Sequence, residues 1–306
     1  MYSGQDDLLE ATLKFINDGL IAGSPIMVLL DEEKIDIISH ELGSDASSVL
    51  FADITDVGAN PGRIIGVWHN FLRRPGGAAR ARQGVTIRGI GEPIYPQRTG
   101  AELVECQLHE SLLNLAFGHE HDFWLLCPYD LDSLSDDVLA EGLRSHPYVA
   151  NGGDRRPSMA YEPPDPSTVF GSRLSPVPVG AIEVHFGRDN LATVRALAAD
   201  EASRLGFLGA QIDEVVTAVH EVAVNALEHG GGDGIVRIWS RGAVLYFEVL
   251  DSGRFADLLA GRLPPGDDWR NGRGLWIANQ LCDLIQIRSD RNGTVVRGQV
   301  RRIGVY

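Results

Sequence analysis

The chain has 306 residues, of which 44% are hydrophobic and 23% charged, a composition typical of a globular protein large enough for two domains. A formal net charge of -15 argues against general binding to nucleic acid or to an anionic membrane surface, because both require clustered lysine and arginine. No apolar run approaches the roughly 20 residues that span a bilayer, and three widely spaced cysteines imply no disulfide framework, so we expect a cytoplasmic protein.

The first half of the chain alternates helical and strand patterns. Residues 7–23 carry apolar side chains at helical spacing, and the wholly apolar run 25–30 is typical of a strand buried on both faces. The alternation continues with helices predicted near 32–42, 61–73, 99–117 and 135–146, and strands near 48–54, 84–91 and 122–130. Strands that alternate with such helices predict a parallel α/β sheet for a domain over residues 1–150.

Residues 151–180 are rich in proline, glycine and serine and show no hydrophobic period. This composition predicts a semi-extended linker between two domains.

The second half has a different order of elements. A strand at 181–186 precedes two long helices at 189–205 and 211–229; a hairpin at 234–253, a helix at 274–283 and a last hairpin at 284–302 follow. Long helices on one face of a mainly antiparallel sheet predict an α+β sandwich over residues 181–306.

The helix at 211–229 carries a polar pair beside its apolar stripe. Glu221 and Asn225 are four residues apart and therefore share a face. A carboxylate and a carboxamide one turn apart can orient a hydroxyl and ligate a hard cation such as Mg²⁺. Alone, the same pattern also fits the solvated edge of an ordinary amphipathic helix.

Two later features favour a binding site. The segment "VLDSG" ends a strand with Asp251 and Gly253, which places a carboxylate at a sheet edge beside a glycine that permits close backbone approach. The segment "NGRGLW" presents Gly272, Arg273 and Gly274 directly before a helix, where free backbone N–H groups favour phosphate.

The stretches "HEVAVNALEHG", "DSG" and "GRGLW" resemble the N, G1 and G2 boxes of the Bergerat-fold (GHKL) ATPases. A short domain without a dimerising histidine helix is similar, within that superfamily, to the anti-sigma-factor serine/threonine kinases. The resemblance covers residues 181–306 and implies ATP and Mg²⁺ as cofactors.

The resemblance also implies a role for each matching residue. Asn225 would ligate Mg²⁺, and Glu221 would act as the general base that deprotonates an acceptor serine. Asp251 would receive the adenine amino group, partly through water, and Gly253 would line the base pocket. The phosphates would be held by Gly272, Arg273 and Gly274, while His229 would close the helix as a structural residue.

The sequence departs from the family pattern after the G1 box. Phe255 stands where a glycine normally lets the backbone pass close to the nucleotide, and the lid loop carries Asp267 and Asp268, which would repel phosphate unless they point away. The resemblance therefore predicts nucleotide binding more strongly than it predicts phosphoryl transfer.

The first half resembles the MEDS sensory domain through "FINDGLIAGSPIMVLL", "FADITDVGANPGRIIGVW", "RGIGEPI", "AELVECQLHESLLNLAF" and "LLCPYD". Such domains are similar to RecA-type nucleotide-binding sheets, but the Walker A pattern G-x-x-x-x-G-K-[ST] does not occur here. Together the two halves look like actinobacterial anti-sigma-factor regulators.

Two sets of residues in the first half are candidate ligand sites. The first set could bind a soft metal and consists of Cys106, His109, His119, His121 and Cys127. The second set could bind a small molecule at the carboxyl edge of the sheet and consists of Glu92, Glu105, Tyr129 and Asp130. A protein-docking surface is the rival interpretation of that edge.

The resemblances imply a regulator that binds ATP·Mg²⁺ and either sequesters a sigma factor or phosphorylates a serine on a STAS-type anti-sigma-factor antagonist, tuned by the N-terminal domain. They also favour a homodimer. One alternative is a catalytically inactive scaffold with the same partners. Another is a small-molecule sensor whose C-terminal domain only dimerises.

Overall fold

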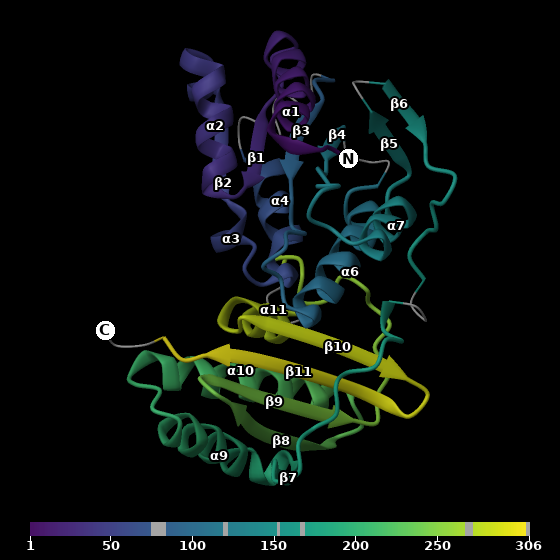
Figure 1. Cartoon of the computed structure of the whole chain (residues 1–306). Helices are drawn as coiled ribbons and strands as arrows, with labels where there is room; N and C mark the ends of the chain where they lie inside the picture. The colour runs from purple at the N-terminus through teal and green to yellow at the C-terminus, as the bar shows by residue number, and fades with distance from the viewer. Residues whose placement is uncertain (75–83, 119–121, 152–153, 166–168, 267–271, 304–306) are drawn as a thin grey trace. The chain divides into compact units, whose positions relative to one another are not determined.

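A computed structural model describes residues 1–74, 84–118, 122–151, 154–165, 169–266 and 272–303 of the chain (Figure 1). The chain divides into two compact units, Met1–Pro164 and Asp165–Tyr306. Each unit is described by itself.

The first unit is built on a four-stranded sheet in the order β2-β1-β3-β4, in which every neighbouring pair is parallel. Its strands are β1 (Ile26–Leu30), β2 (Val49–Asp53), β3 (Ile87–Gly91) and β4 (Phe123–Leu126). Its helices are α1 (Gly4–Ile21), α2 (Glu32–Leu42), α3 (Ile54–Val57), α4 (Ile64–Leu72), α6 (Gly100–Ala116) and α7 (Asp136–Ser145), with short 3-10 turns η1 (Gly43–Ser48) and η2 (Pro61–Arg63). This confirms the predicted parallel α/β sheet.

Helices cover both faces of this sheet, which explains the uninterrupted apolar run of β1. On one face, Val28 of β1 and Ile90 of β3 share a core with Ile16 of α1 and Ile38 of α2. On the other face, glycines leave room for the Trp68 ring of α4, since a Cβ at Gly89 or Gly91 would lie 2.9 Å from it.

A short antiparallel hairpin, β5 (Tyr148–Asn151) and β6 (Asp154–Pro157), completes the first unit. It extends into the segment that composition predicts to be a linker. Residues 169–180 of the same segment belong to the second unit, where Phe170 is buried. The part of the segment in the first unit, residues 155–164, is exposed or half-buried, whereas Phe170 enters the core of the second unit.

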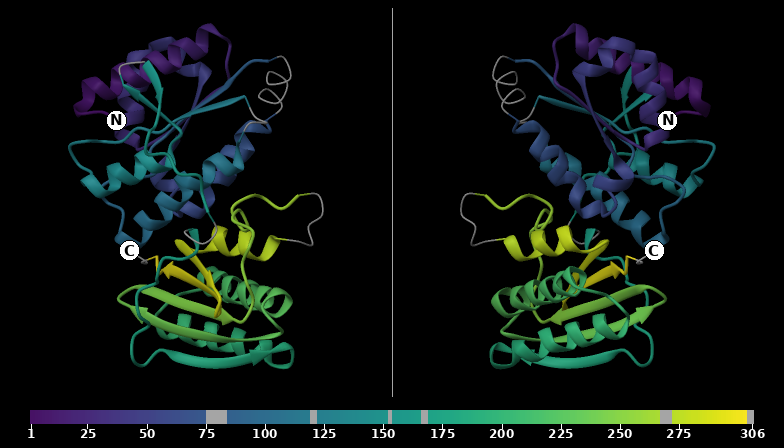
Figure 2. Two further views of the ribbon diagram at one scale, coloured as in Figure 1. Left: turned by 90° about the vertical axis from the view of Figure 1, so that its right-hand side faces the viewer. Right: turned by 90° about the vertical axis from the view of Figure 1, so that its left-hand side faces the viewer.

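The second unit is a five-stranded antiparallel sheet in the order β10-β11-β9-β8-β7. Its strands are β7 (Ile182–Gly187), β8 (Asp233–Arg241), β9 (Val244–Asp251), β10 (Leu284–Asp290) and β11 (Gly293–Arg301). The turn η3 (Arg188–Asn190) leads into α9 (Leu191–Arg204); α9 and α10 (Ala210–His229) pack together on one face of the sheet, and α11 (Arg273–Leu281) packs against α10 (Figures 1 and 2). This confirms the predicted α+β sandwich.

Within the ranges that the structure describes, no helix combines the length and apolar character needed to cross a bilayer.

Candidate functional site

Helix α10 supplies the centre of the candidate site. Its buried stripe packs against β8, β9 and β11 and consists of Val215, Ala218, Val219, Val222, Ala223, Ala226 and Leu227. Glu221 and Asn225 lie beside this stripe and are half-buried, whereas Glu228 and His229 are exposed. The two residues predicted to be functional are thus less exposed than the two polar residues in the last turn of the helix.

The first turn of α11 packs directly against Glu221. Gly272 precedes the helix with a φ of 78°, a left-handed conformation that favours glycine, and Arg273 and Gly274 begin the helix. A Cβ on Gly274 would lie 3.1 Å from Oε2 of Glu221 and 3.3 Å from its backbone oxygen. The unsatisfied N–H groups of a helix start and a carboxylate are thus brought side by side.

The end of β9 packs against the carboxyl end of α10. A Cβ on Gly230 would lie 2.3 Å from Cγ of Asp251, and one on Gly253 would lie 2.6 Å from the backbone oxygen of His229. Ser252 strengthens the contact, because its backbone N–H and its hydroxyl both donate to the Gly230 carbonyl, at 3.1 and 3.0 Å. Glycine is needed at 230 and 253 for this close approach.

The Asp251 carboxylate is fixed by the chain itself. Its Oδ1 accepts the backbone N–H of Gly253 at 2.7 Å, and its Oδ2 is the atom that can accept a donor such as an amino group of a ligand. Burial raises the pKa of Asp251 above its ordinary value, and the Gly253 N–H and the nearby His229 oppose that rise.

Sequence reasoning missed a pair of hydroxyls that hold the segment after Asp251. Thr294 donates to the Gly253 carbonyl at 2.9 Å, Ser289 lies 2.9 Å from Thr294, and the Ser289 hydroxyl accepts the Phe255 N–H at 2.9 Å. Ser289 and Thr294 face each other in the β10–β11 register. The sequence signal for this pair is the segment "SDRNGT", in which Ser289 and Thr294 lie on either side of the predicted hairpin turn.

Phe255, the departure from the family pattern, is held by an aromatic partner. Its ring meets that of Phe170 edge-on, with centroids 5.4 Å apart and planes at 89°. Phe170 is anchored in turn, because its carbonyl accepts the Ser289 N–H at 3.3 Å. Asp267 and Asp268, the predicted acidic pair of the lid loop, lie outside the described residues.

The structure therefore gathers the predicted residues around α10. Asp251 and Gly253 lie at the carboxyl end of the helix, Gly274 lies at Glu221, and Asn225 is on the helix between these two contacts. The arrangement brings a hydrogen-bond acceptor, a carboxamide, a carboxylate and the start of a helix together around one helix.

In the first unit, Glu92 is engaged in an internal network. Its carboxylate accepts the Tyr2 hydroxyl at 2.7 Å and pairs with the Lys34 ammonium at 2.5 Å, and Asp31 lies 3.0 Å from the same ammonium. Burial would lower the pKa of Lys34, but the Glu92 carboxylate raises it above the ordinary value. Of the other predicted edge residues, Glu105 and Tyr129 are also buried and Asp130 is half-buried.

Of the predicted soft-metal ligands, the three that the structure describes, Cys106, His109 and Cys127, do not form a group with metal-binding proximity. Cys106 is buried and donates its thiol proton to the Pro93 carbonyl, and His119 and His121 lie outside the described residues. Among the residues the structure describes, one group of histidine, cysteine and carboxylate atoms has metal-binding proximity: Glu110, Cys127 and His146. It shares only Cys127 with the predicted set.

Comparisons with known proteins match each unit separately. Residues 1–147 match the family model of the MEDS domain, the methanogen/methylotroph DcmR sensory domain. Residues 187–299 match the model of the histidine kinase-like ATPase domain.

Among solved structures, the RsbU and RsbW domains of Rv1364c from Mycobacterium tuberculosis are similar at 22% identity, with a TM-score of 0.30 over 39% of this chain and 32% of that one. The match thus spans about a third of that chain. None of the curated proteins matches this sequence.

Proposed function

Because the chain joins an N-terminal MEDS domain to a C-terminal histidine kinase-like ATPase domain, we propose that it is a cytoplasmic regulator that binds ATP·Mg²⁺. In this proposal it sequesters a sigma factor, phosphorylates a serine on a STAS-type anti-sigma-factor antagonist, or does both. The N-terminal domain tunes the choice in response to a ligand, and the active form is a homodimer.

One observation carries most of the support for nucleotide binding. Asp251 is half-buried against Gly230, and its Oδ1 is held by the Gly253 N–H, which leaves Oδ2 to accept the amino group of adenine. An acceptor whose orientation is fixed before binding costs little to order when the ligand arrives. The segment that would line the base is held by Thr294 in the same way.

Glu221 and Asn225 fit the phosphate end of the same ligand. Asn225 would ligate Mg²⁺ through its carboxamide oxygen, and the N–H groups that begin α11 would receive phosphate oxygens, with Gly272, Arg273 and Gly274 forming the approach. Glu221 would accept the proton of the acceptor serine's hydroxyl. The serine oxygen would then form a bond to the γ-phosphorus while the bond from that phosphorus to the leaving ADP breaks.

Calorimetric titration of the full chain with ATP, with and without Mg²⁺, tests the binding step. We expect micromolar binding that requires Mg²⁺ and weakens at least tenfold in Asn225→Ala, because a cation ligand is lost. Asn17→Ala, the same change at an exposed position of α1, is the control and should bind as the wild type does. Absence of binding at millimolar ATP contradicts the proposal and leaves the C-terminal domain as a dimerisation module.

The transfer step is tested with Glu221→Gln in a phosphorylation assay on STAS-type antagonist proteins. Loss of a general base lowers such rates by about 10²–10⁴, while ATP affinity should stay within a few-fold of wild type. Glu214→Gln changes the same residue type two turns earlier at an exposed position of α10 and should remain active.

A catalytically inactive scaffold is the second candidate, and the Phe255–Phe170 contact is the observation that favours it. It predicts ATP binding without phosphoryl transfer in the wild type.

A further inference from the structure

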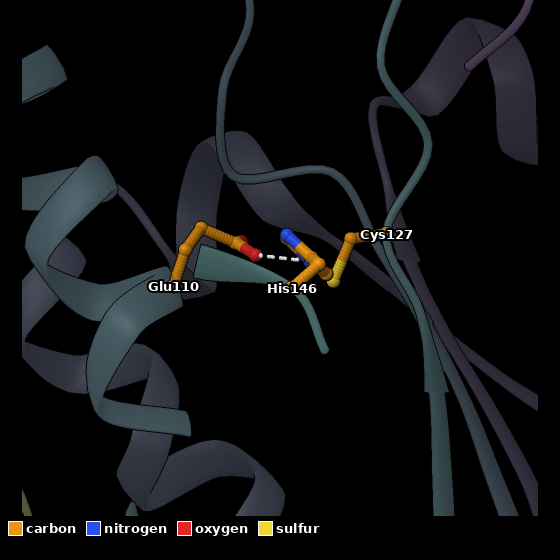
Figure 3. A group of neighbouring side chains, drawn as sticks. All are labelled: Glu110, Cys127 and His146. Carbon is orange, nitrogen blue, oxygen red and sulfur yellow. Dashed lines mark ion pairs between the residues drawn. The ribbon is translucent and has the colours of Figure 1, made fainter. Parts of the chain in front are cut away.

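Three side chains capable of binding a metal meet in the first unit (Figure 3). Glu110 comes from α6, Cys127 follows β4, and His146 caps the end of α7. One carboxylate oxygen, the sulfur and one imidazole nitrogen all lie within 4.8 Å of one another. The three residues come from three separate elements, so tertiary packing alone brings them together.

The backbone fixes the orientation of the His146 ring. Its Nδ1 lies 2.8 Å from the Gly142 carbonyl, and a carbonyl can only accept, so Nδ1 carries a hydrogen. The other nitrogen, Nε2, faces Oε2 of Glu110 at 3.0 Å. Metal-bound histidines typically donate their second nitrogen to a carbonyl or carboxylate in this way, because it fixes the ring and raises the basicity of the ligating nitrogen.

We propose that Glu110, Cys127 and His146 form a binding site for a thiophilic divalent cation of the zinc class. Thiolate, imidazole and carboxylate are the three ligand types that zinc accepts, at about 2.3, 2.0–2.1 and 2.0–2.2 Å respectively. Tetrahedral binding at those lengths puts nitrogen and oxygen ligands roughly 3.3 Å apart. The pair at 3.0 Å therefore has to separate by only a few tenths of an ångström.

The exchange of protons for metal balances in charge. Without metal, a proton lies between His146 and Glu110, and Cys127 keeps its thiol proton, so the group of carboxylate, imidazolium and thiol is neutral. Binding of M²⁺ releases both protons and leaves carboxylate, neutral imidazole and thiolate around the cation, which is again neutral. A buried site can accept this exchange because no uncompensated charge is created.

The charges around the site agree with this description. Burial would raise the pKa of Glu110, but His146, and after it His109, lower that pKa below its ordinary value. Burial and the Glu110 carboxylate raise the pKa of the Cys127 thiol. Other titratable groups that act on these residues are the Tyr129 hydroxyl, the Cys106 thiol and the N-terminal amino group.

The site is partly exposed to solvent. The Glu110 side chain is 1% exposed, whereas that of His146 is 22% exposed. Three protein ligands leave one tetrahedral position open, the arrangement found where zinc binds water or substrate and not where it is purely structural. The open position would take water or a small anionic ligand.

The test uses the full chain and Co²⁺ as a spectroscopic probe, with affinity for Zn²⁺ measured against a chromophoric chelator. We expect one equivalent of metal, a sulfur-to-cobalt charge-transfer band, and loss of that band with at least a 100-fold weaker affinity in Cys127→Ser. Cys106→Ser and Cys282→Ser change the other two cysteines and should keep the band. Equal binding by wild type and Cys127→Ser, or no stoichiometric binding at micromolar Zn²⁺, overturns the proposal.

A second measurement needs no variant and so does not depend on whether Cys127→Ser folds. Titration of wild type with Zn²⁺ at neutral pH, in two buffers of different ionisation enthalpy, counts the protons released. The proposed exchange predicts close to two per cation, and affinity that rises by up to about 100-fold per pH unit. Release of no proton contradicts ligation by Cys127 and His146. Neither measurement involves ATP, so the outcome is independent of the proposed function.

Discussion

At the scale of single residues, Asp251 combines opposing demands. Burial raises the pKa of its carboxyl, so the ionised form lowers the stability of the ligand-free protein at neutral pH, whereas in the proposed function the ionised form is the stronger acceptor for the amino group of adenine. Functional groups often have such a stability cost, because the site is organised for the ligand and not for the empty protein.

Asp251→Asn separates the two effects. Oδ1 of the amide can still accept the Gly253 N–H, which places the amide nitrogen where Oδ2 stood, so that a donor faces the donor of the ligand. We expect ATP affinity to fall about tenfold or more, while the melting temperature of the ligand-free protein at pH 7 is unchanged or raised.

The sign of the pH dependence follows from the raised pKa of Asp251. Its neutral form stabilises the fold at low pH, and that contribution is lost as pH rises through the folded-state pKa. The stability advantage of Asp251→Asn should therefore fade as pH is lowered through that range, as thermal melts at several pH values will show. Asp189→Asn, at an exposed position, is the control; unchanged ATP affinity in Asp251→Asn would contradict the assigned role.

At the scale of elements, three glycines let two separate segments contact α10. Gly230 and Gly253 bring the end of β9 to its carboxyl end, and Gly274 brings α11 to Glu221. In the proposed function, the helix would carry the base-binding contact and the phosphate-binding contact on one rigid element, where sites are held more accurately than on loops.

Gly230→Ala tests this arrangement. The φ of Gly230 is -102°, so alanine causes no backbone strain, but its Cβ would lie 2.3 Å from Cγ of Asp251 and 2.5 Å from the Ala226 carbonyl. We expect a loss of about 1–3 kcal/mol in the free energy of unfolding, together with weaker ATP binding because Asp251 is displaced. Gly187→Ala, where nothing lies within 4 Å, should leave both unchanged; wild-type ATP affinity in Gly230→Ala would show that Asp251 need not stay in place.

At the scale of the whole molecule, the later part of the predicted linker, residues 169–180, belongs to the second unit. Phe170 packs on Phe255, and Ser175 accepts two hydrogen bonds from Arg297, at 2.9 Å through its hydroxyl and 2.7 Å through its carbonyl. Arg297 is buried and also pairs with Glu248. These contacts attach residues 170 and 175 of the predicted linker to Phe255, which follows Asp251 in the chain, and to Arg297 of β11.

Two fragments measure what this attachment contributes. Residues 165–306 should fold on their own and bind ATP, whereas residues 181–306 lose the Phe170 ring and the two Ser175 acceptors of Arg297. We expect the shorter fragment to be less stable by about 3 kcal/mol or more, from the lost aromatic burial and the buried guanidinium left with fewer partners. Urea denaturation compares them, and equal stability would show that the segment is a passive linker.

Much of this protein is determined locally and could be read from its sequence. The strand near 25–30 follows from an uninterrupted apolar run and the stripe of the helix at 211–229 from helical periodicity, and both depend only on side chains within a few residues of each other. The shared face of Glu221 and Asn225 and the glycine-led start at Gly272 are local in the same sense, and so are the motifs behind both domain resemblances.

Tertiary structure alone decided which distant side chains meet. The engagement of Glu92 by Tyr2 and Lys34, the hydroxyl contact of Thr294 with Gly253, the burial of Phe170 and the grouping of Glu110, Cys127 and His146 join residues from separate elements. No local preference encodes such pairings, because they depend on how whole helices and strands pack. Polar side chains that look like candidate ligands in sequence are therefore assigned to a network or to a site only when their neighbours in the folded chain are known.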